Sequence, residues 1–356
     1  MAKRTLFLSI VAGLLLSLTG IATLAQEPLG PVTQRIVDRG SLICGVNQAV
    51  RGFGFVNDEG QFEGFDIDFC KAVAVAVLGD AEAVIYRPIT AAERQAAIQS
   101  GEIDMMARNT TNTLSRDVVW TSTFGPTNFY DGQGVMTLAS LGVTTIDELD
   151  GASMCVQAGT TTELNITDYI ESRGLNIEIQ VYPEANPTWE AYISGRCEAW
   201  TTDKSGLASF RLTAPDPGAH VILAETISKE PLGPLSPQDD EQFATIIRWT
   251  VYGLIQAEEF GITSENIGDF VQQDGEDDAA YNARVSPAVA RFLGMGGNQA
   301  GSYLGLSETF MVDVITQVGN YGEIYERHLV PLGLVREGSL NALWTEGGLM
   351  YSPPFR

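Results

Sequence analysis

One short segment, residues 101–116 (GEIDMMARNTTNTLSR), carries the side chains whose types and spacing best suit binding chemistry. Its apolar run, 103–107, predicts a strand that ends in a polar loop with Asn109 and Thr111, and Arg116 follows. An arginine guanidinium is a planar fork that fits a carboxylate through two parallel hydrogen bonds. Amide and hydroxyl groups beside it can donate further bonds without adding charge. The segment therefore predicts a carboxylate-binding loop, and the competing interpretation is an ordinary polar turn with a solvated arginine.

The elements that must position this loop alternate between strand and helix. We expect strands at 42–47, 83–87 and 103–107, and helices at 67–78 and from a capping box at 90–93 to 100. This order predicts a parallel sheet with helices on both faces. The pattern repeats after Leu141, with strands expected at 153–157, 177–182 and 199–202 and helices at 162–173, 187–194 and 203–213. Two similar α/β units imply two lobes.

Five sequence blocks in register carry a family resemblance. Besides the loop at 109–116, they are GFDID at 64–68, QAGTTTE at 157–163, GRCEAWTTD at 195–203, and a closing segment that begins VGNYGEIYERHL at 318. In this order and spacing, the chain resembles the polar amino-acid-binding proteins of bacterial ABC importers. It is most similar to the general L-amino-acid-binding subfamily, over about residues 32–356.

The resemblance implies an α/β fold of two hinge-linked lobes, the periplasmic binding protein fold, with parallel-type sheets and flanking helices. Lobe 1 is expected at 26–138 and 235–356, and lobe 2 at 139–234. The chain is expected to cross between the lobes near 137–140 and to return near 231–234.

The resemblance also assigns roles to site residues. Asn109, Thr111 and Arg116 are implied to bind a ligand carboxylate from the first lobe, and Thr161 from the second through its backbone N–H, at a helix start that favours anions. Asp203 is implied to pair with the ligand ammonium, because a buried unpaired charge is costly. The plainer alternatives are an Arg116–Asp117 ion pair and simple helix caps. The family usually places a small hydroxyl side chain where Asn109 stands, and an amide also donates.

The side-chain pocket is less well marked. Phe53, Tyr130 and Gln157 are expected at the cleft wall or within reach of the ligand side chain. Many family members carry an aromatic residue where Val50 stands. Its absence removes a wall for planar or cationic side chains and suits broad selectivity.

Charge and composition limit the possible partners. The 356-residue chain has a net charge of −24, which argues against nucleic acid and anionic membrane surfaces. No C-x-x-C occurs, and the only histidines, His220 and His328, stand alone, so we expect neither a metal nor a cofactor. The chain is expected to be a monomer that binds a free L-amino acid and docks on the permease subunits of an ABC importer.

Four cysteines, Cys44, Cys70, Cys155 and Cys197, stand in a chain with an export signal. An even count in an oxidising compartment suggests disulfides, of which four cysteines allow three pairings. Two cysteines fall in each expected lobe, so Cys44–Cys70 with Cys155–Cys197 is the economical pairing. Buried free thiols are the alternative.

Three classes of function remain in competition. The leading interpretation is an extracytoplasmic amino-acid receptor that closes on its ligand. A few relatives of this fold act as dehydratases, but such proton transfer needs suitably tuned acids and bases, and two isolated histidines are a poor supply. A sensory or adhesive protein with the same fold is the third class. The sequence does not rank the amino acids or give the affinity, and it does not identify the permease.

The first 25 residues predict a secretory signal peptide. Lys3 and Arg4 precede an apolar run, 6–24, and the small residues Thr23 and Ala25 suit cleavage before Gln26. No cysteine follows that run before Cys44, so a lipid attachment site is not expected, and an unanchored binding protein points to a Gram-negative-type periplasm. N-terminal sequencing of periplasmic protein should begin at Gln26. A mature chain that keeps Met1 would support the alternative, an uncleaved N-terminal anchor.

Overall fold

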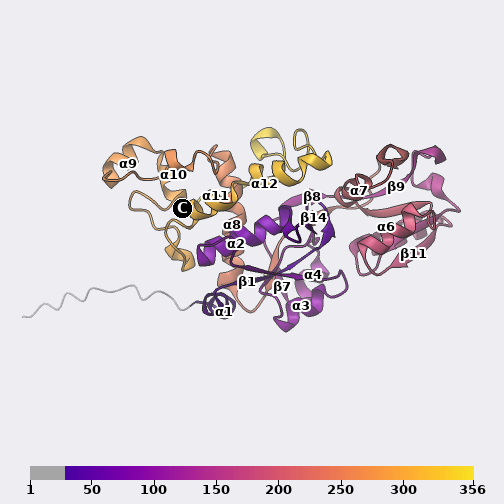
Figure 1. The fold of residues 1–356 in the computed structure, drawn as a ribbon, viewed down its shortest axis with the longest axis horizontal. Coiled ribbons are helices and arrows are strands. Elements are labelled where there is room, and N and C mark those ends of the chain that lie inside the picture. Colours follow the sequence, from indigo (N-terminus) through magenta and orange to yellow (C-terminus); the bar gives the residue numbers. More distant parts are fainter. Residues whose placement is uncertain (1–28) are drawn as a thin grey trace, which may run out of the picture.

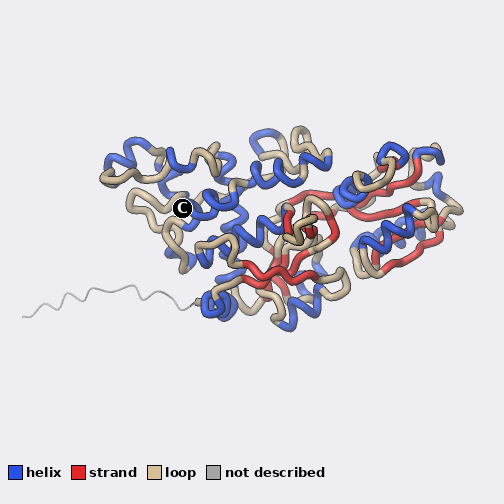
Figure 2. Tube along the Cα trace, in the orientation of Figure 1, coloured by secondary structure: helices blue, strands red, loops and turns tan. Residues whose placement is uncertain are grey.

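The computed structural model describes residues 29–356, and the expected signal peptide, 1–25, lies outside the described residues. The chain forms two α/β lobes side by side, each with its own five-stranded sheet (Figures 1 and 2). Within residues 29–356, no helix combines the length and the apolar character that a membrane crossing requires.

Lobe 1 is built on a mixed sheet of order β5-β1-β6-β15-β7. Its strands are β1 (Leu42–Val46), β5 (Val84–Pro88), β6 (Met105–Met106), β7 (Ser122–Phe124) and β15 (Leu235–Pro237). The first three are parallel as expected, but β15 runs antiparallel to both β6 and β7. The parallel pairing predicted for these three strands is therefore confirmed, and the chain returning from lobe 2 adds β15 in the opposite direction.

The helices of lobe 1 bury apolar residues in the core of the lobe. They are α1 (Pro31–Arg39), α2 (Phe65–Leu78), α3 (Arg94–Ser100), α4 (Leu114–Val119) and α8 (Glu241–Glu259). Helix α2 is buried along most of its length and contacts β1, α8 and α11 (Phe310–Val318), as its apolar sequence predicted. A small sheet of β2 (Ala49–Val50), β3 (Gly54–Val56) and β4 (Phe62–Glu63) precedes α2.

Lobe 2 repeats the plan with the order β11-β10-β12-β9-β13. Its strands are β9 (Gln133–Leu138), β10 (Ser153–Gln157), β11 (Glu178–Tyr182), β12 (Ala199–Asp203) and β13 (His220–Ile222). Its helices are α5 (Thr161–Arg173), α6 (Ala185–Ile193) and α7 (Lys204–Arg211). Strands β10, β11 and β12 are parallel, and β9 and β13 close the sheet with antiparallel pairing.

The lobes are joined by two antiparallel strands, β8 (Phe129–Asp131) and β14 (Glu230–Leu232). We call this pair the hinge. The chain crosses earlier than expected, because β9 pairs with β12 over its length, from Gln133 opposite Asp203 to Thr137 opposite Ala199. Residues 133–138, assigned to lobe 1 from the sequence, therefore belong to the second sheet.

The C-terminal third of the chain is largely helical and adds to lobe 1. Helices α9 (Asp278–Arg284) and α10 (Pro287–Phe292) lie at the end of lobe 1 that is furthest from lobe 2 (Figure 1). Helices α11 and α12 (Tyr321–His328) contact α2 and α8. This addition encloses the core behind the first sheet and leaves the edge that faces lobe 2 open for a site.

Candidate functional site

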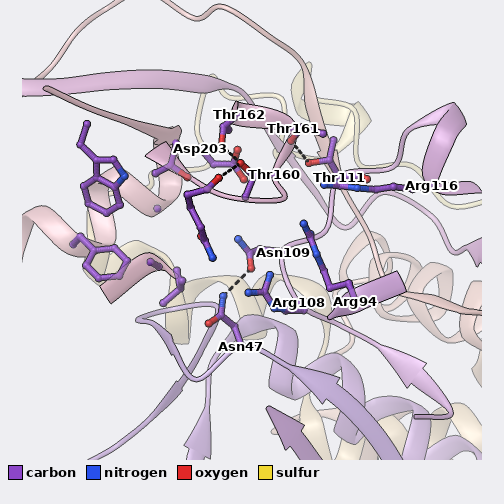
Figure 3. Close-up of a pocket in the computed structure, with 17 residues that line it drawn as sticks. Asn47, Arg94, Arg108, Asn109, Thr111, Arg116, Thr160, Thr161, Thr162 and Asp203 are labelled. Atoms are coloured by element: carbon purple, nitrogen blue, oxygen red, sulfur yellow. Dashed lines mark hydrogen bonds between the residues drawn. The ribbon is translucent and has the colours of Figure 1, made fainter. Parts of the chain in front are cut away.

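A polar cavity lies between the lobes, where the carboxyl ends of parallel strands from both sheets face each other (Figure 3). Loops at this end of α/β sheets are a usual place for ligands. Lobe 1 supplies Asn47, Val50, Arg94, Arg108, Asn109, Thr111 and Arg116. Lobe 2 supplies Gln157, Thr160, Thr161, Thr162, Ala185, Trp200, Thr202, Asp203, Gly206 and Phe210.

Arg116 is held at the cavity with part of its guanidinium unused. Thr113 caps α4 by accepting a hydrogen bond from the Arg116 backbone N–H at 3.2 Å. The Arg116 Nη1 atom donates to the Thr111 carbonyl at 2.8 Å, and the guanidinium lies over the Trp120 ring. Within residues 29–356 its Nε and Nη2 atoms make no hydrogen bond, and Arg116 forms no ion pair, with Asp117 or any other acid. Burial lowers the Arg116 pKa, while Glu230 and Asp203 oppose that shift.

Asn109 is fixed in a backbone conformation that non-glycine residues seldom adopt, with φ of 31°. Its backbone N–H donates to Asp66 Oδ2 at 2.6 Å, and its Oδ1 accepts from Asn47 Nδ2 at 3.1 Å. The Asn109 amide nitrogen is therefore the donor that remains available. Asp66 lies within the first turn of α2 and holds the binding loop. Burial raises the Asp66 pKa to about 7, against the Asn109 hydrogen bond and the Arg108 charge.

The start of α5 presents backbone donors from lobe 2. Thr160 is the capping residue, and its hydroxyl accepts from the Glu163 N–H at 3.1 Å. Thr161 and Thr162 occupy the first helical positions, whose N–H groups have no partner inside the helix. The simple capping role considered for this segment thus falls to Thr160. Thr161 is left at the positive end of the helix, where an anion is favoured.

Asp203 ends β12 and precedes α7, but its side chain makes no capping hydrogen bond. Only 7% of Asp203 is exposed, and its carboxylate has no hydrogen bond or ion pair within residues 29–356. Burial raises the Asp203 pKa well above its usual value, Asp131 and Glu230 raise it further, and Arg116 and Arg94 oppose the shift. An ammonium ion at this point would restore the ionised carboxylate.

Two further arginines, Arg94 and Arg108, line the cavity and were not predicted. Arg94 reaches across the lobes, with Nη2 donating to the Gly159 carbonyl at 3.0 Å. Arg108 Nε donates to the Ile89 carbonyl at 2.8 Å. Neither forms an ion pair within residues 29–356, and burial lowers both pKa values, that of Arg108 to about 10. The signal for Arg108 was its place beside Asn109, whereas the helix pattern around Arg94 gave no such sign.

The structure changes the expected side-chain pocket. Gln157 and Val50 line the cavity, but Phe53 and Tyr130 are not among its lining residues. Phe53 is buried in the lobe 1 core against Phe65 and Phe129. Tyr130 lies in hinge strand β8, opposite Pro231.

An apolar wall of the cavity also escaped the sequence analysis. Trp200 and Phe210 provide it, with ring centroids 5.0 Å apart. The Trp200 Nε1 atom is buried and has no hydrogen-bond partner among the described residues. Buried donors normally find a partner, so this N–H is an unsatisfied polar group in the cavity wall. Trp200 lies in the strand predicted at 199–202, and the sequence analysis did not assign it to the site.

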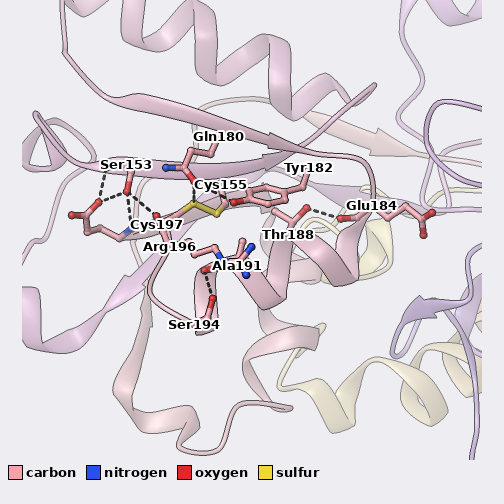
Figure 4. The surroundings of a disulfide bond; sticks show 11 residues. Ser153, Cys155, Gln180, Tyr182, Glu184, Thr188, Ala191, Ser194, Arg196 and Cys197 are labelled. Atoms are coloured by element: carbon pink, nitrogen blue, oxygen red, sulfur yellow. Dashed lines mark hydrogen bonds between the residues drawn. A yellow bond between two sulfur atoms is a disulfide. The ribbon is translucent and has the colours of Figure 1, made fainter.

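Both predicted disulfides are present, Cys44–Cys70 and Cys155–Cys197 (Figure 4). Cys44 lies in β1, the strand that leads to Asn47, and Cys70 lies in α2, which carries Asp66. Cys155 lies in β10 just before Gln157, and Cys197 precedes β12. Each bond therefore braces the part of a lobe from which cavity residues extend.

Two α/β lobes on a two-strand hinge, with a buried polar cavity between them, define a receptor that encloses a small solute. The model for bacterial extracellular solute-binding proteins, family 3, matches residues 42–274, and the chain belongs to this family. It is a solute-binding protein rather than an enzyme.

Two relatives and one solved structure are similar to this protein over almost the whole chain. The general L-amino acid-binding periplasmic protein AapJ of Rhizobium johnstonii is 46% identical, over 89% of this chain and 91% of AapJ. The glutamate/glutamine/aspartate/asparagine-binding protein BztA of Rhodobacter capsulatus is 44% identical, over 95% and 98%. A solved periplasmic binding protein from Brucella ovis with glutathione bound superposes with a TM-score of 0.85 at 43% identity, covering 91% of this chain and 99% of that one.

The elevated pKa of Asp66 predicts a specific pH dependence of stability. Because the folded-state pKa of Asp66, about 7, exceeds the usual value of 3.8, the folded protein holds this proton more tightly than the unfolded chain. The stabilisation is complete below about pH 4 and is lost as the pH rises towards about 7. In urea unfolding, the wild type should lose about 1 kcal/mol or more relative to Asp66→Asn over that range. Other acids titrate in both proteins, so a pH-independent difference would contradict the assignment.

Proposed function

We propose that the protein is a periplasmic receptor that binds free L-α-amino acids with broad specificity and delivers them to an ABC-type permease. The names of AapJ and BztA support the ligand class, and the name of AapJ also supports the compartment. We further propose export by the signal peptide at 1–25 and action as a monomer that engages the permease, with no nucleic-acid partner. In this proposal a bound ligand bridges the lobes, so the closed form becomes the favoured one.

The proposed binding mode places one end of the amino acid on each lobe. Arg116 binds the α-carboxylate through its unused N–H groups, with the Asn109 amide and the backbone N–H groups of Thr111 and Thr161 as further donors. Asp203 binds the α-ammonium. The observation that carries the proposal is that Arg116 and Asp203 line one cavity from opposite lobes, both buried and neither in an ion pair within residues 29–356.

The side-chain end of the cavity is cationic on one side and apolar on another. Once Arg116 and Asp203 are matched to the ligand backbone, Arg94 and Arg108 remain without a counter-charge in the lining. Acidic and amide side chains are thereby favoured, and cationic ones are opposed. Trp200 and Phe210 provide contact area for apolar side chains. We therefore propose broad selectivity among acidic and neutral amino acids.

Removal of either charged residue of this clamp should nearly abolish binding. Truncation of one member of a buried charge pair costs about 2–5 kcal/mol, or tens- to thousands-fold in affinity. Calorimetry should show such losses for Arg116→Ala and Asp203→Ala with every amino acid tested. Arg116→Lys should also bind poorly, because an ammonium lacks the bidentate fork.

The matched control for the clamp is Arg173→Ala. This exposed arginine pairs with Asp147 on the surface of lobe 2 and should leave affinity unchanged. Circular dichroism confirms the fold of each variant. Affinities of Arg116→Ala and Asp203→Ala within about threefold of the parent, a difference below about 1 kcal/mol, would place the site elsewhere.

A second candidate ligand is a γ-glutamyl peptide, which the glutathione bound to the Brucella ovis relative favours. The glutamyl unit of glutathione keeps a free α-ammonium and a free α-carboxylate, so the same clamp fits it. A second cavity of about 260 Å³ adjoins the first and shares Asn47, Arg108, Gln157 and Ala185 with it. Arg87 lines only this outer cavity, where its guanidinium pairs with Glu102 at 2.7 Å through Nε, and in this binding mode it also contacts the distant carboxylate.

Three ligands separate the two candidates. Glutathione should bind, while the α-linked isomer Glu-Cys-Gly should not, because its peptide bond consumes the glutamyl α-carboxylate. Arg87→Ala should weaken glutathione by about tenfold, the size of one lost charge-assisted contact, and leave L-glutamate unchanged. Equal binding of the two isomers, or no binding of glutathione at millimolar concentration, would remove this candidate and leave the amino-acid receptor intact.

A further inference from the structure

A buried carboxylate, Glu230, lies at the hinge behind two of the proposed ligand-binding residues. It begins β14, is 1% exposed and is not part of the cavity lining. Its Oε2 atom accepts hydrogen bonds from the hydroxyls of Thr111 at 2.6 Å and Thr161 at 2.8 Å. Its Oε1 atom accepts from Asn165 Nδ2 at 2.9 Å and from the Ser228 hydroxyl at 2.5 Å.

These four neutral donors explain how the carboxylate is buried without a salt bridge. Glu230 forms no ion pair within residues 29–356, although Arg116 is near enough for their charges to interact. In each of the four contacts a carboxylate oxygen of Glu230 is the acceptor. The direction of each of these bonds is therefore set, with the proton supplied by the partner.

The contacts with Glu230 fix the direction of the Thr111 and Thr161 hydroxyl protons. A hydroxyl has one proton and two lone pairs. Since Thr111 and Thr161 give their protons to Glu230, their hydroxyls can offer only lone pairs to the cavity that both residues line. Lone pairs attract an ammonium and repel a carboxylate.

We propose that Glu230 is a positioning residue that sets the hydrogen-bond polarity of the site. By taking both protons, it turns the Thr111 and Thr161 hydroxyls into acceptors for the ligand's α-ammonium, beside Asp203. The inference rests on the proposed function and refines it. It assigns these hydroxyls to the ammonium end and leaves the carboxylate to Arg116, the Asn109 amide and the backbone N–H groups of Thr111 and Thr161.

The same contacts connect this polarity to the position of the lobes. Thr111 belongs to lobe 1, Thr161 and Asn165 belong to lobe 2, and Glu230 stands on the hinge strand between them. One carboxylate therefore orients acceptors from both lobes at once. The receptor thus completes its ammonium site on closure and selects amino acids over acids that lack the amino group.

The test compares Glu230→Gln with the parent by calorimetry, using L-glutamate and glutarate, which differ only in the α-amino group. Glutarate affinity is measured by competition against L-glutamate. When the amide nitrogen of the glutamine takes the place of Oε2, which accepts from both threonines, it donates to their hydroxyls and turns both threonine protons towards the cavity. Affinity for L-glutamate should fall about 10- to 100-fold, as for lost hydrogen bonds to a charged group, while that for glutarate should change by less than about threefold. An equal fall for both ligands would show a structural role only.

A double-mutant cycle gives an independent readout. Thr111→Val with Thr161→Val removes the hydroxyls and should also weaken L-glutamate but not glutarate. In that background Glu230→Gln should have little further effect, because the groups it orients are gone. Additive losses would overturn the proposal even if Glu230→Gln alone is poorly folded. A parent that binds no amino acid would refute the proposed function, whereas a parent that binds with an unaffected Glu230→Gln variant would refute only this inference.

Discussion

The site depends on two opposite charges that are buried on different lobes and not paired with each other. Arg116 and Asp203 both line the cavity and are largely removed from water. Burial lowers the pKa of Arg116 and raises the pKa of Asp203, and each shift favours the neutral form of the side chain. Such groups are costly until a partner arrives. In the proposed binding mode a zwitterion pairs with both groups at once. Because this pairing requires contact with both lobes, it stabilises the closed form relative to the open one.

The fold keeps these charges apart by giving each its own sheet. Strand β6 and the loop after it bring Arg116 to the cavity, and β12 brings Asp203 from the opposite side. The disulfides lie inside the lobes, Cys44–Cys70 in one and Cys155–Cys197 in the other. Neither crosses the hinge. Rigid lobes with two connecting strands confine the motion to the place where it changes the distance between the charges.

The parts of the site that could be predicted are those that a strand or helix boundary marks. Arg116 follows a strand end, and Asp203 stands where a strand becomes a helix, so their sequence neighbours report their position. Arg94 is different, because it is a surface-type residue of a helix and enters the site only through the packing of lobe 1 against Gly159. Trp200 has the pattern of a core strand residue, and its open N–H is visible only once its surroundings are known.

Two predictions about the fold were wrong because they concerned positions that long-range contacts determine. Residues 133–138 were placed in lobe 1 because the crossing was expected near 137–140, and only their pairing with β12 reveals their sheet. Phe53 was expected at the cleft wall. The turn between Val50 and Phe53 carries it into the core. Nearness in the sequence therefore did not predict which lobe or which face a residue belongs to where contacts between distant segments determine its position.

The selectivity of the site depends on which of its polar groups are held by other residues before the ligand binds. Where the proposed binding mode places the amino-acid head, Asn109 is held by Asp66 and Asn47, and the hydroxyls of Thr111 and Thr161 are held by Glu230. Groups fixed before binding lose little entropy when the ligand arrives, so they discriminate sharply. Around the side chain, the lining consists of two unpaired arginines, an apolar wall and a cavity that continues outward. A net charge of −24 does not prevent this local excess of cations, because the arginines are enclosed by low-dielectric protein while most acids lie in screening solvent. A rigid head-group clamp beside a permissive side-chain chamber is the arrangement expected of a receptor that recognises what all amino acids share.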